Sequence, residues 1–291
     1  MQTPDVKEAL LELVRRTATD LPADAEKALR DAREREAPGS AALSAIDTIL
    51  ANVALARKNS TPICQDTGTP IFYVHYPVGW SSRALEAQIG SAVAEATARS
   101  YLRPNAVHSV TGTNSNNNVG EGVPTVHAEE WDEAYLKVDL MLKGGGCENV
   151  SAQYSLPDSQ LGAGRDLAGV RKVVLDAIYK AQGEGCAPGI AGVAIGGDRG
   201  VSYFKAKEQL FRPLEDKAEA PELAALETRL TDEANSLGIG PMGFGGQTTV
   251  LGVKVGTAHR HPASFFVTVA YMCWADRRRT LTWRNGDFSV A

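Results

Sequence analysis

The chain contains four cysteines, and three of them, Cys64, Cys186 and Cys273, stand near glycine, proline or aspartate in segments expected to be loops. They are far apart in the sequence and lack the C-x-x-C pairs with which zinc fingers and redox dithiols take their ligands. A shared metal centre would therefore be assembled by folding distant segments together. Three thiolates around one centre leave a coordination position open for substrate. The pattern favours catalysis over structural metal binding.

Cys64 opens a dense polar segment, in which Gln65, Asp66 and Thr67 follow it directly. The segment precedes an apolar stretch expected to be a strand, so an amide, a carboxylate and a hydroxyl would gather at the beginning of that strand. A plain turn in which Asp66 caps the local backbone explains the same residues without any chemistry. Both interpretations stay open on this segment alone.

A run of glycines, Gly144, Gly145 and Gly146, lies between Lys143 and Cys147. Consecutive glycines let backbone N–H groups approach a small anion closely, which makes a concave site for a carboxylate or a phosphate. The segment lacks the spacing and the Lys-Ser/Thr ending of a nucleotide-binding P-loop. Glycines that only make a tight turn are an equally good interpretation.

His261 lies between Arg260 and Pro262, in a loop after which an expected strand leads to Cys273. A lone histidine is most often a hydrogen-bonded polar residue without a catalytic role. Its place near a candidate metal ligand makes His261 a candidate for proton transfer.

The elements that must position these loops alternate along the chain. Apolar residues recur at three and four up to about residue 59, with a break at Pro38 and Gly39, which predicts helices. Strands are expected at 71–74, 134–142, 248–255, 265–271 and after Cys186. Helices are expected at 83–101 and 165–182, and 205–236 is expected to be mostly helical with breaks near Pro213 and at Pro221. The predicted fold class is α/β (mixed α+β), a mixed sheet with helical cover. A helical segment 1–59 is expected to pack on a main domain 60–291.

Composition bounds the class of protein. A chain of 291 residues with 43% hydrophobic content is long enough to bury a large core. The net charge of -5 and the absence of a long basic run argue against a nucleic-acid surface. No apolar run is long enough to span a membrane, and the first residues do not have the pattern of a secretory signal. We therefore expect a cytoplasmic protein, in which cysteines are thiols or metal ligands.

Five loops together carry a family resemblance. The segments PICQDTG, KGGGCEN, GCAPGIAGVAIGG, RHPAS and YMCWADR occur in this order between about residues 60 and 279. They resemble the iron-sulfur hydro-lyases that comprise class I fumarate hydratases and the alpha subunits of L(+)-tartrate dehydratase. Any one loop is a weak match, but five in order are specific. The resemblance implies the N-terminal, alpha-type catalytic domain of that family.

The resemblance implies a [4Fe-4S] cluster held by Cys64, Cys186 and Cys273, with one iron open to substrate. Cys147 falls where the family often carries serine, so it is interpreted as a small loop residue rather than a fourth ligand. By the same resemblance Asp66 and His261 are catalytic, His261 at the substrate hydroxyl and Asp66 as a partner in proton delivery. The residues expected to bind substrate are Gln65, Arg103, Lys143, Gly144, Gly145 and Gly146.

The implied reaction is the reversible hydration of fumarate to L-malate, a step of the tricarboxylic acid cycle. Dehydration of L(+)-tartrate to oxaloacetate is the closest alternative, and mesaconate is a further candidate substrate. Single-chain members continue well beyond their third cysteine, whereas this sequence ends at Ala291. The resemblance therefore implies a separate beta subunit in an α2β2 heteromer, with little activity from this chain alone.

A different class of function is also compatible with the cysteines. A non-catalytic iron-sulfur module that senses oxidation would use the same thiols. It would give no role to Gln65, Asp66 and His261. A structural zinc site is a weaker alternative, because the cysteines lack paired spacing.

Overall fold

The structure is a computed structural model that describes residues 3–291. The chain folds into two compact units. Unit 1 consists of the described residues up to 22, of 51–145 and of 277–291, and unit 2 consists of 23–50 and 146–276. The chain passes from one unit to the other at several points, and two of these points fall inside loops discussed above. One lies within the glycine run, and the other lies between Asp276 and Arg277.

Unit 1 contains a five-stranded mixed sheet. Its strands are β1 (Thr69–Pro77), β2 (Thr125–Trp131), β3 (Leu136–Lys143), β8 (Arg278–Arg284) and β9 (Asp287–Val290). They are ordered β2-β1-β3-β8-β9, and only β1 and β2 run parallel. In this register Thr69 lies opposite Lys143, and Met141 lies opposite Arg278. The beginning of β1, the end of β3 and the beginning of β8 therefore lie at the same end of the sheet.

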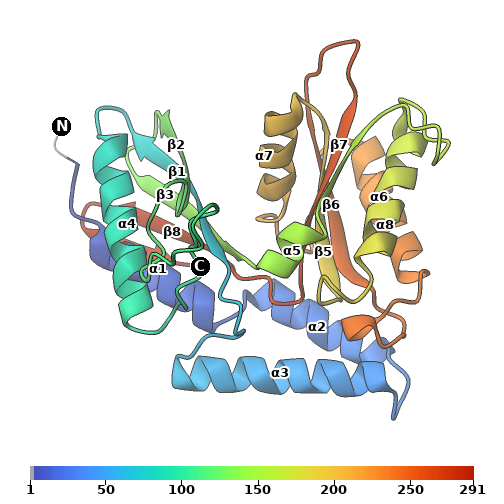
Figure 1. The fold of residues 1–291 in the computed structure, drawn as a ribbon, viewed down its shortest axis with the longest axis horizontal. Coiled ribbons are helices and arrows are strands. Elements are labelled where there is room, and N and C mark those ends of the chain that lie inside the picture. The colour runs from blue at the N-terminus through green and yellow to red at the C-terminus, as the bar shows by residue number, and fades with distance from the viewer. Residues whose placement is uncertain (1–2) are drawn as a thin grey trace. The chain divides into compact units, whose positions relative to one another are not determined.

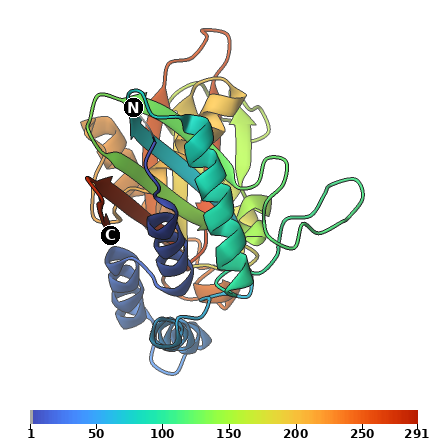
Figure 2. The same cartoon turned by 90° about the vertical axis from the view of Figure 1, so that its left-hand side faces the viewer.

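Two helices, α1 (Lys7–Thr19) and α4 (Ser82–Ala98), lie side by side against this sheet (Figures 1 and 2). The side chain of Ser81 caps α4 by accepting a 3.2 Å hydrogen bond from the Ala84 N–H. Apolar residues at helical spacing meet alternate residues of the strands, so both periodicities bury one common core. That core includes Leu10, Leu13, Phe72, Val74, Leu85, Ile89, Val138 and Leu140.

Unit 2 contains a four-stranded sheet. Its strands are β4 (Ala152–Ser155), β5 (Gly189–Gly196), β6 (Val250–Ala258) and β7 (Phe266–Met272), in the order β4-β7-β5-β6. β5 pairs parallel with β6 and antiparallel with β7. Every residue of β5 is buried, which explains its continuous apolar sequence.

Helices cover both faces of this second sheet (Figure 1). α6 (Leu167–Ala181) and α8 (Pro221–Asn235) share one hydrophobic core with the strands. α7 (Arg199–Gln209) packs on β5 at Gly192, where a Cβ atom would lie 2.2 Å from the Ala206 carbonyl oxygen. Only glycine permits this close approach. The remaining helical elements are α2 (Ala23–Arg35), α3 (Ala41–Asn59), α5 (Gly145–Asn149) and the 3-10 turn η1 (Pro241–Gly243).

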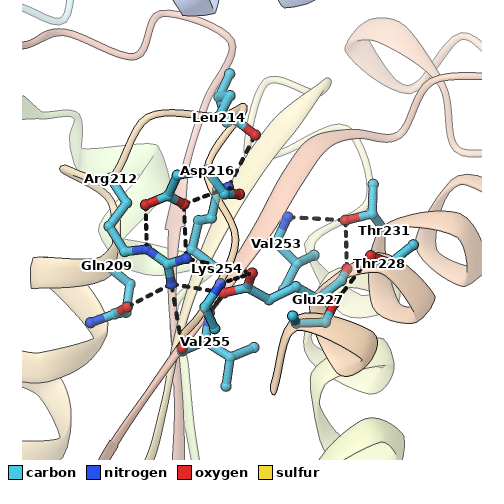
Figure 3. Close-up of polar contacts among 12 residues, drawn as sticks. Gln209, Arg212, Leu214, Asp216, Glu227, Thr228, Thr231, Val253, Lys254 and Val255 are labelled. Carbon is cyan, nitrogen blue, oxygen red and sulfur yellow. Dashed lines mark hydrogen bonds and ion pairs between the residues drawn. The ribbon is translucent and has the colours of Figure 1, made fainter. Parts of the chain in front are cut away.

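A partly buried charged network joins several elements of unit 2 (Figure 3). The Arg212 guanidinium donates to Oε1 of Glu227 at 2.7 Å and to Oδ1 of Asp216 at 2.8 Å. Lys254 donates to the same Asp216 oxygen at 3.0 Å. Burial opposes the charge on each side chain, but the partners outweigh it, so the pKa of Arg212 is raised and the pKa of Asp216 is lowered. The network joins β6, α8 and the segment after α7.

The predicted mixed α/β class with a helical N-terminal segment is confirmed. The break expected near Pro213 in the helical stretch 205–236 lies between the end of α7 at Gln209 and the beginning of α8 at Pro221, and α7 begins earlier than expected, where Asp198 caps it. Strands β2, β4, β8 and β9 were not predicted. The expected division at residue 59 remains a prediction about domains. Within residues 3–291 no helix combines the length and the apolar character that a membrane crossing needs.

Candidate active-site loops

Cys64 lies in the loop between α3 and β1 of unit 1, and it is half-buried. Both backbone polar groups of the preceding residue, Ile63, are hydrogen-bonded. The Ile63 N–H donates to the Ala18 carbonyl at 3.0 Å, and its carbonyl accepts from Nδ2 of Asn52 at 2.8 Å. The loop therefore leaves the helices of unit 1 from a fixed point just before the thiol.

Asp66 follows in the same loop, and the chain itself fixes its carboxylate. Oδ1 accepts from the Gly68 N–H at 3.0 Å, and Oδ2 accepts from the Gly145 N–H at 2.8 Å. The Arg277 guanidinium holds the Asp66 carbonyl at 2.6 Å. These contacts follow from the register of β1, β3 and β8, which brings their adjoining loops to one end of the sheet.

The glycine run fits closely around this carboxylate. A Cβ atom on Gly144 would lie 2.9 Å from Oδ2 of Asp66, so a side chain there would displace it. Gly144 is buried, whereas Gly145 and Gly146 are exposed. Lys143 is fully buried at the end of β3. That these residues bind substrate stays a prediction, and the Gly145 N–H already has a carboxylate as its acceptor.

Gln65 and Arg103, both predicted to bind substrate, are brought together in unit 1. Nη1 of Arg103 donates to the Gln65 carbonyl at 3.3 Å, and both residues are exposed. The long bond and the exposure leave the guanidinium accessible to an anion. A planar guanidinium is suited to a bidentate grip on a carboxylate.

Cys186 and Cys273 lie in neighbouring loops of unit 2. The Trp274 N–H donates to the Cys186 carbonyl at 3.3 Å, which joins the two loops next to both thiols. Cys186 adopts a φ of +53°, a conformation that residues other than glycine rarely adopt. Cys186 is half-buried and Cys273 is 8% exposed. The fold thus presents two of the predicted ligands together.

The ring of Tyr271 is the surface on which the Cys186 loop rests. A Cβ atom on Gly185 would lie 2.5 Å from this ring, and one on Gly189 would lie 2.1 Å from it. Burial raises the pKa of Tyr271, and the charges of Cys273, Cys147 and Cys186 raise it further. All three thiols of unit 2 therefore lie in the surroundings of one buried phenol.

His261 is exposed in the loop between β6 and β7. Its Nδ1 accepts a 3.1 Å hydrogen bond from the Ala263 N–H, so a neutral ring carries its proton on Nε2. The Arg165 guanidinium holds the loop by donating to the Ala263 carbonyl at 2.8 Å. A neutral imidazole in this tautomer presents an N–H donor to a ligand.

The three cysteines predicted as ligands, Cys64, Cys186 and Cys273, have the chemistry that an iron-sulfur cluster needs. Thiolates are the ligands such clusters take, and no disulfide joins the four cysteines. Cys64 belongs to unit 1, and Cys186 and Cys273 belong to unit 2. Across residues 3–291 no group of three or more His, Cys, Asp or Glu residues is arranged to hold a single ion.

Two further residues shape these loops, and the sequence assigned no role to either, although both lie in the YMCWADR segment. Arg277, which is 1% exposed, holds the Asp66 loop through its hydrogen bond to the Asp66 carbonyl. Tyr271 reads as an ordinary strand residue. The glycines that flank Cys186 are the sequence feature that could have indicated a large side chain packed against this loop, because glycine often marks a close approach.

The model of one protein family, described as Fumarate hydratase (Fumerase), matches residues 7–282. The chain is 52% identical over 274 residues to a protein of Geobacillus stearothermophilus provisionally named fumarate hydratase class I. That match covers 93% of the chain but 53% of the Geobacillus protein, so the chain spans about half of that relative.

Shorter relatives are matched along more of their length. The chain is 35% identical to a protein of Methanocaldococcus jannaschii provisionally named L(+)-tartrate dehydratase subunit alpha, a match that covers 94% of the chain and 95% of that protein. It is 33% identical to the L(+)-tartrate dehydratase subunit alpha of Escherichia coli K12, over 80% of the chain and 76% of that subunit.

Proposed function

The chain belongs to the fumarate hydratase (Fumerase) family, and from this premise we propose that it is the cluster-carrying part of a hydro-lyase that interconverts fumarate and L-malate. One observation carries the proposal. The carboxylate of Asp66, two residues after Cys64, is held in place by backbone N–H groups. A carboxylate that is fixed beside a candidate metal ligand would be positioned to exchange a proton with a substrate bound there.

Cys64, Cys186 and Cys273 are the residues that would hold a [4Fe-4S] cluster. When bound, a cluster with one iron lacking a cysteine ligand supplies a Lewis acid without any change of redox state. The contact between the loops of Cys186 and Cys273 supports this ligand set. Cys147 is left out of it, although it lies in the same surroundings of Tyr271.

The residues of the chain would assist both ends of the reaction. Hydration adds a hydroxyl group to one olefinic carbon and a proton to the other, and the reverse reaction removes both. Hydroxide is a poor leaving group, and the C–H beside a carboxylate is a weak acid. His261 would donate from Nε2–H to the substrate hydroxyl oxygen, and Asp66 would take part in proton delivery.

A small dicarboxylate would be bound by groups from several loops. Arg103 is accessible and would grip one carboxylate, with Gln65 beside it. Lys143, Gly144, Gly145 and Gly146 are proposed to contribute to the same subsite. For Gly145, a substrate carboxylate would have to share the N–H that Asp66 now accepts from.

L(+)-tartrate is the second candidate substrate, and the comparisons favour each candidate in a different way. The higher identity is to the protein named for fumarate hydration, whereas the closer match in length is to the tartrate dehydratase alpha subunits. Because the names of the alpha-subunit relatives imply a beta partner, we propose a separately encoded beta subunit for this chain and an α2β2 assembly. The partner would complete the substrate pocket.

Turnover of fumarate, mesaconate and L-tartrate by the anaerobically cluster-loaded protein, with and without its beta partner, tests this proposal. We expect fumarate turnover to depend on the partner. Serine in place of Cys64, Cys186 or Cys273 should abolish cluster absorbance, and Cys147→Ser should retain it. Full turnover without a partner would contradict the subunit proposal.

Spectroscopy distinguishes the proposed hydro-lyase from the alternative, a cluster that only senses oxidation. A hydro-lyase cluster that has been reduced by one electron, and is therefore paramagnetic, should change its electron paramagnetic resonance spectrum when a dicarboxylate is added, because substrate would reach the open iron. A cluster that only senses oxidation should not respond. An unchanged spectrum at saturating fumarate, malate and tartrate would favour the sensor.

A further inference from the structure

A buried amide lies within an exposed stretch of unit 1. Asn118 is 2% exposed and has a φ of +59°, whereas most residues of the surrounding segment 104–120 are exposed. In Figure 2 this green segment follows α4 and extends away from it. A buried polar side chain in such a loop needs partners for all its polar atoms.

Asn118 uses its full hydrogen-bonding capacity on the residues that begin this segment. Oδ1 accepts from the Asn105 N–H at 2.7 Å and from the Ala106 N–H at 3.1 Å. Nδ2 donates to the Arg103 carbonyl at 2.8 Å and to Oγ1 of Thr97 at 3.0 Å. An asparagine amide offers two donors and two acceptor sites, so the set is complete.

Thr67 holds the same residues from the other side. It is 1% exposed and directly follows Asp66 in the Cys64 loop. Its Oγ1 accepts from the Arg103 N–H at 3.0 Å and from Nδ2 of Asn105 at 3.0 Å. Both backbone polar groups of Arg103 are therefore bound by buried side chains, Thr67 at the N–H and Asn118 at the carbonyl.

The backbone of Arg103 is thus fixed while its guanidinium stays accessible. A ligand that meets a pre-positioned arginine does not have to order the loop, and that ordering would otherwise weaken binding. We propose that Asn118 and Thr67 are positioning residues that set dicarboxylate affinity through Arg103, without touching the substrate. This inference rests on the proposed role of Arg103 in binding a substrate carboxylate.

The test compares two glycine variants of one loop in the complete, cluster-loaded enzyme. Asn118→Gly removes four hydrogen bonds but keeps a residue that tolerates positive φ. Asn116→Gly is the matched control, because Asn116 has a φ of +62° and is exposed in the same loop. We expect Asn118→Gly to raise KM about 10- to 100-fold with little change in kcat. Asn116→Gly should stay within about twofold.

Thr67 gives a second pair of variants that does not depend on the fold of the loop tip. Thr67→Val removes the hydroxyl at nearly constant volume and should raise KM, whereas Thr67→Ser keeps the hydroxyl and should restore the wild-type value. Iron content and the thermal midpoint, measured on every variant, show whether folding is retained. A rise in KM for the serine variant equal to that for valine would contradict the role of the hydroxyl.

A double-mutant cycle decides whether Asn118 acts through Arg103. If it does, Asn118→Gly has little further effect on KM when Arg103 is already alanine. Independent, multiplying effects would overturn the inference and leave the function of Arg103 intact. An unchanged KM in Arg103→Ala alone would instead overturn the proposed binding role of Arg103, and this inference with it.

Discussion

The backbone N–H of Gly145 donates a 2.8 Å hydrogen bond to Oδ2 of Asp66. The glycine run therefore does what consecutive glycines suggest, since it lets an N–H approach an anion closely. The anion is a side chain of the same chain, from the loop that carries Cys64. One consequence is that Asp66 is oriented before any substrate arrives.

Replacing Asp66 by asparagine tests whether turnover needs its ionisable carboxyl group, because the two side chains have nearly the same shape. Asp66→Asn keeps an oxygen for one of the two N–H donors but removes the group that exchanges a proton. We expect kcat to fall by about 10²- to 10⁴-fold, the usual contribution of a positioned acid or base. Steady-state kinetics with fumarate and L-malate measure this, with the exposed Asp132→Asn as the control. Retention of full kcat would remove Asp66 from proton delivery.

The fit of Gly144 against Asp66 gives a second prediction. Gly144→Ala would place a Cβ 2.9 Å from Oδ2, so the carboxylate has to move. A displacement of about 1 Å at a catalytic group costs on the order of 10²-fold in rate. Gly120→Ala, where no atom lies within 4 Å of the new Cβ, should leave kcat unchanged. Equal rates for the two variants would mean that the orientation of Asp66 does not limit turnover.

Much of the fold could be predicted because its signals are local. Residues of α1, α4 and α6 repeat at helical spacing, and the family resemblance carried by the five loops is confirmed by the family match. β8 was missed because its polar side chains have distant partners. Arg279 in that strand donates to Asp20 at 3.0 Å, and such a pairing leaves no mark in the neighbouring sequence.

The candidate site divides in the same way. Gln65 and Asp66 could be linked to Cys64 because they follow it directly. The contacts of Asp66 with Gly145 and Arg277 depend on the register of three strands, which no local pattern specifies. The amide of Asn118 could not be told apart from the other asparagines around it, since only the folded loop buries it.

The ring of Tyr271 should be needed for the Cys186 loop to hold iron. Tyr271→Ala removes the surface that Gly185 and Gly189 contact, so Cys186 loses its support. Phe265→Ala is the control, because it also removes a buried ring of unit 2. Both variants should lose about 3–5 kcal/mol of stability. Only Tyr271→Ala should lose iron at a temperature where both stay folded, and Tyr271→Phe should keep it. Equal iron retention in the two alanine variants, measured by iron analysis, would contradict this.

The network around Glu227 should be a main source of stability for unit 2. Oε1 of Glu227 accepts from Arg212 and from the Val255 N–H at 2.7 Å each, and Oε2 accepts from the Ala218 N–H at 3.0 Å. In Glu227→Gln the new NH₂ group must face one of these donors, and Arg212 loses a buried partner. We expect unfolding by urea to show a loss of about 3–5 kcal/mol.

The matched control for this network is Glu222→Gln, in the exposed first turn of the same helix. It should change the free energy of unfolding by no more than about 0.5 kcal/mol, because its charge is solvated. A loss in Glu227→Gln as small as that of the control would show that Asp216 alone satisfies Arg212. For Arg212 the two carboxylates would then be redundant, and Asp216→Asn should cost more in the Glu227→Gln background than in the wild type.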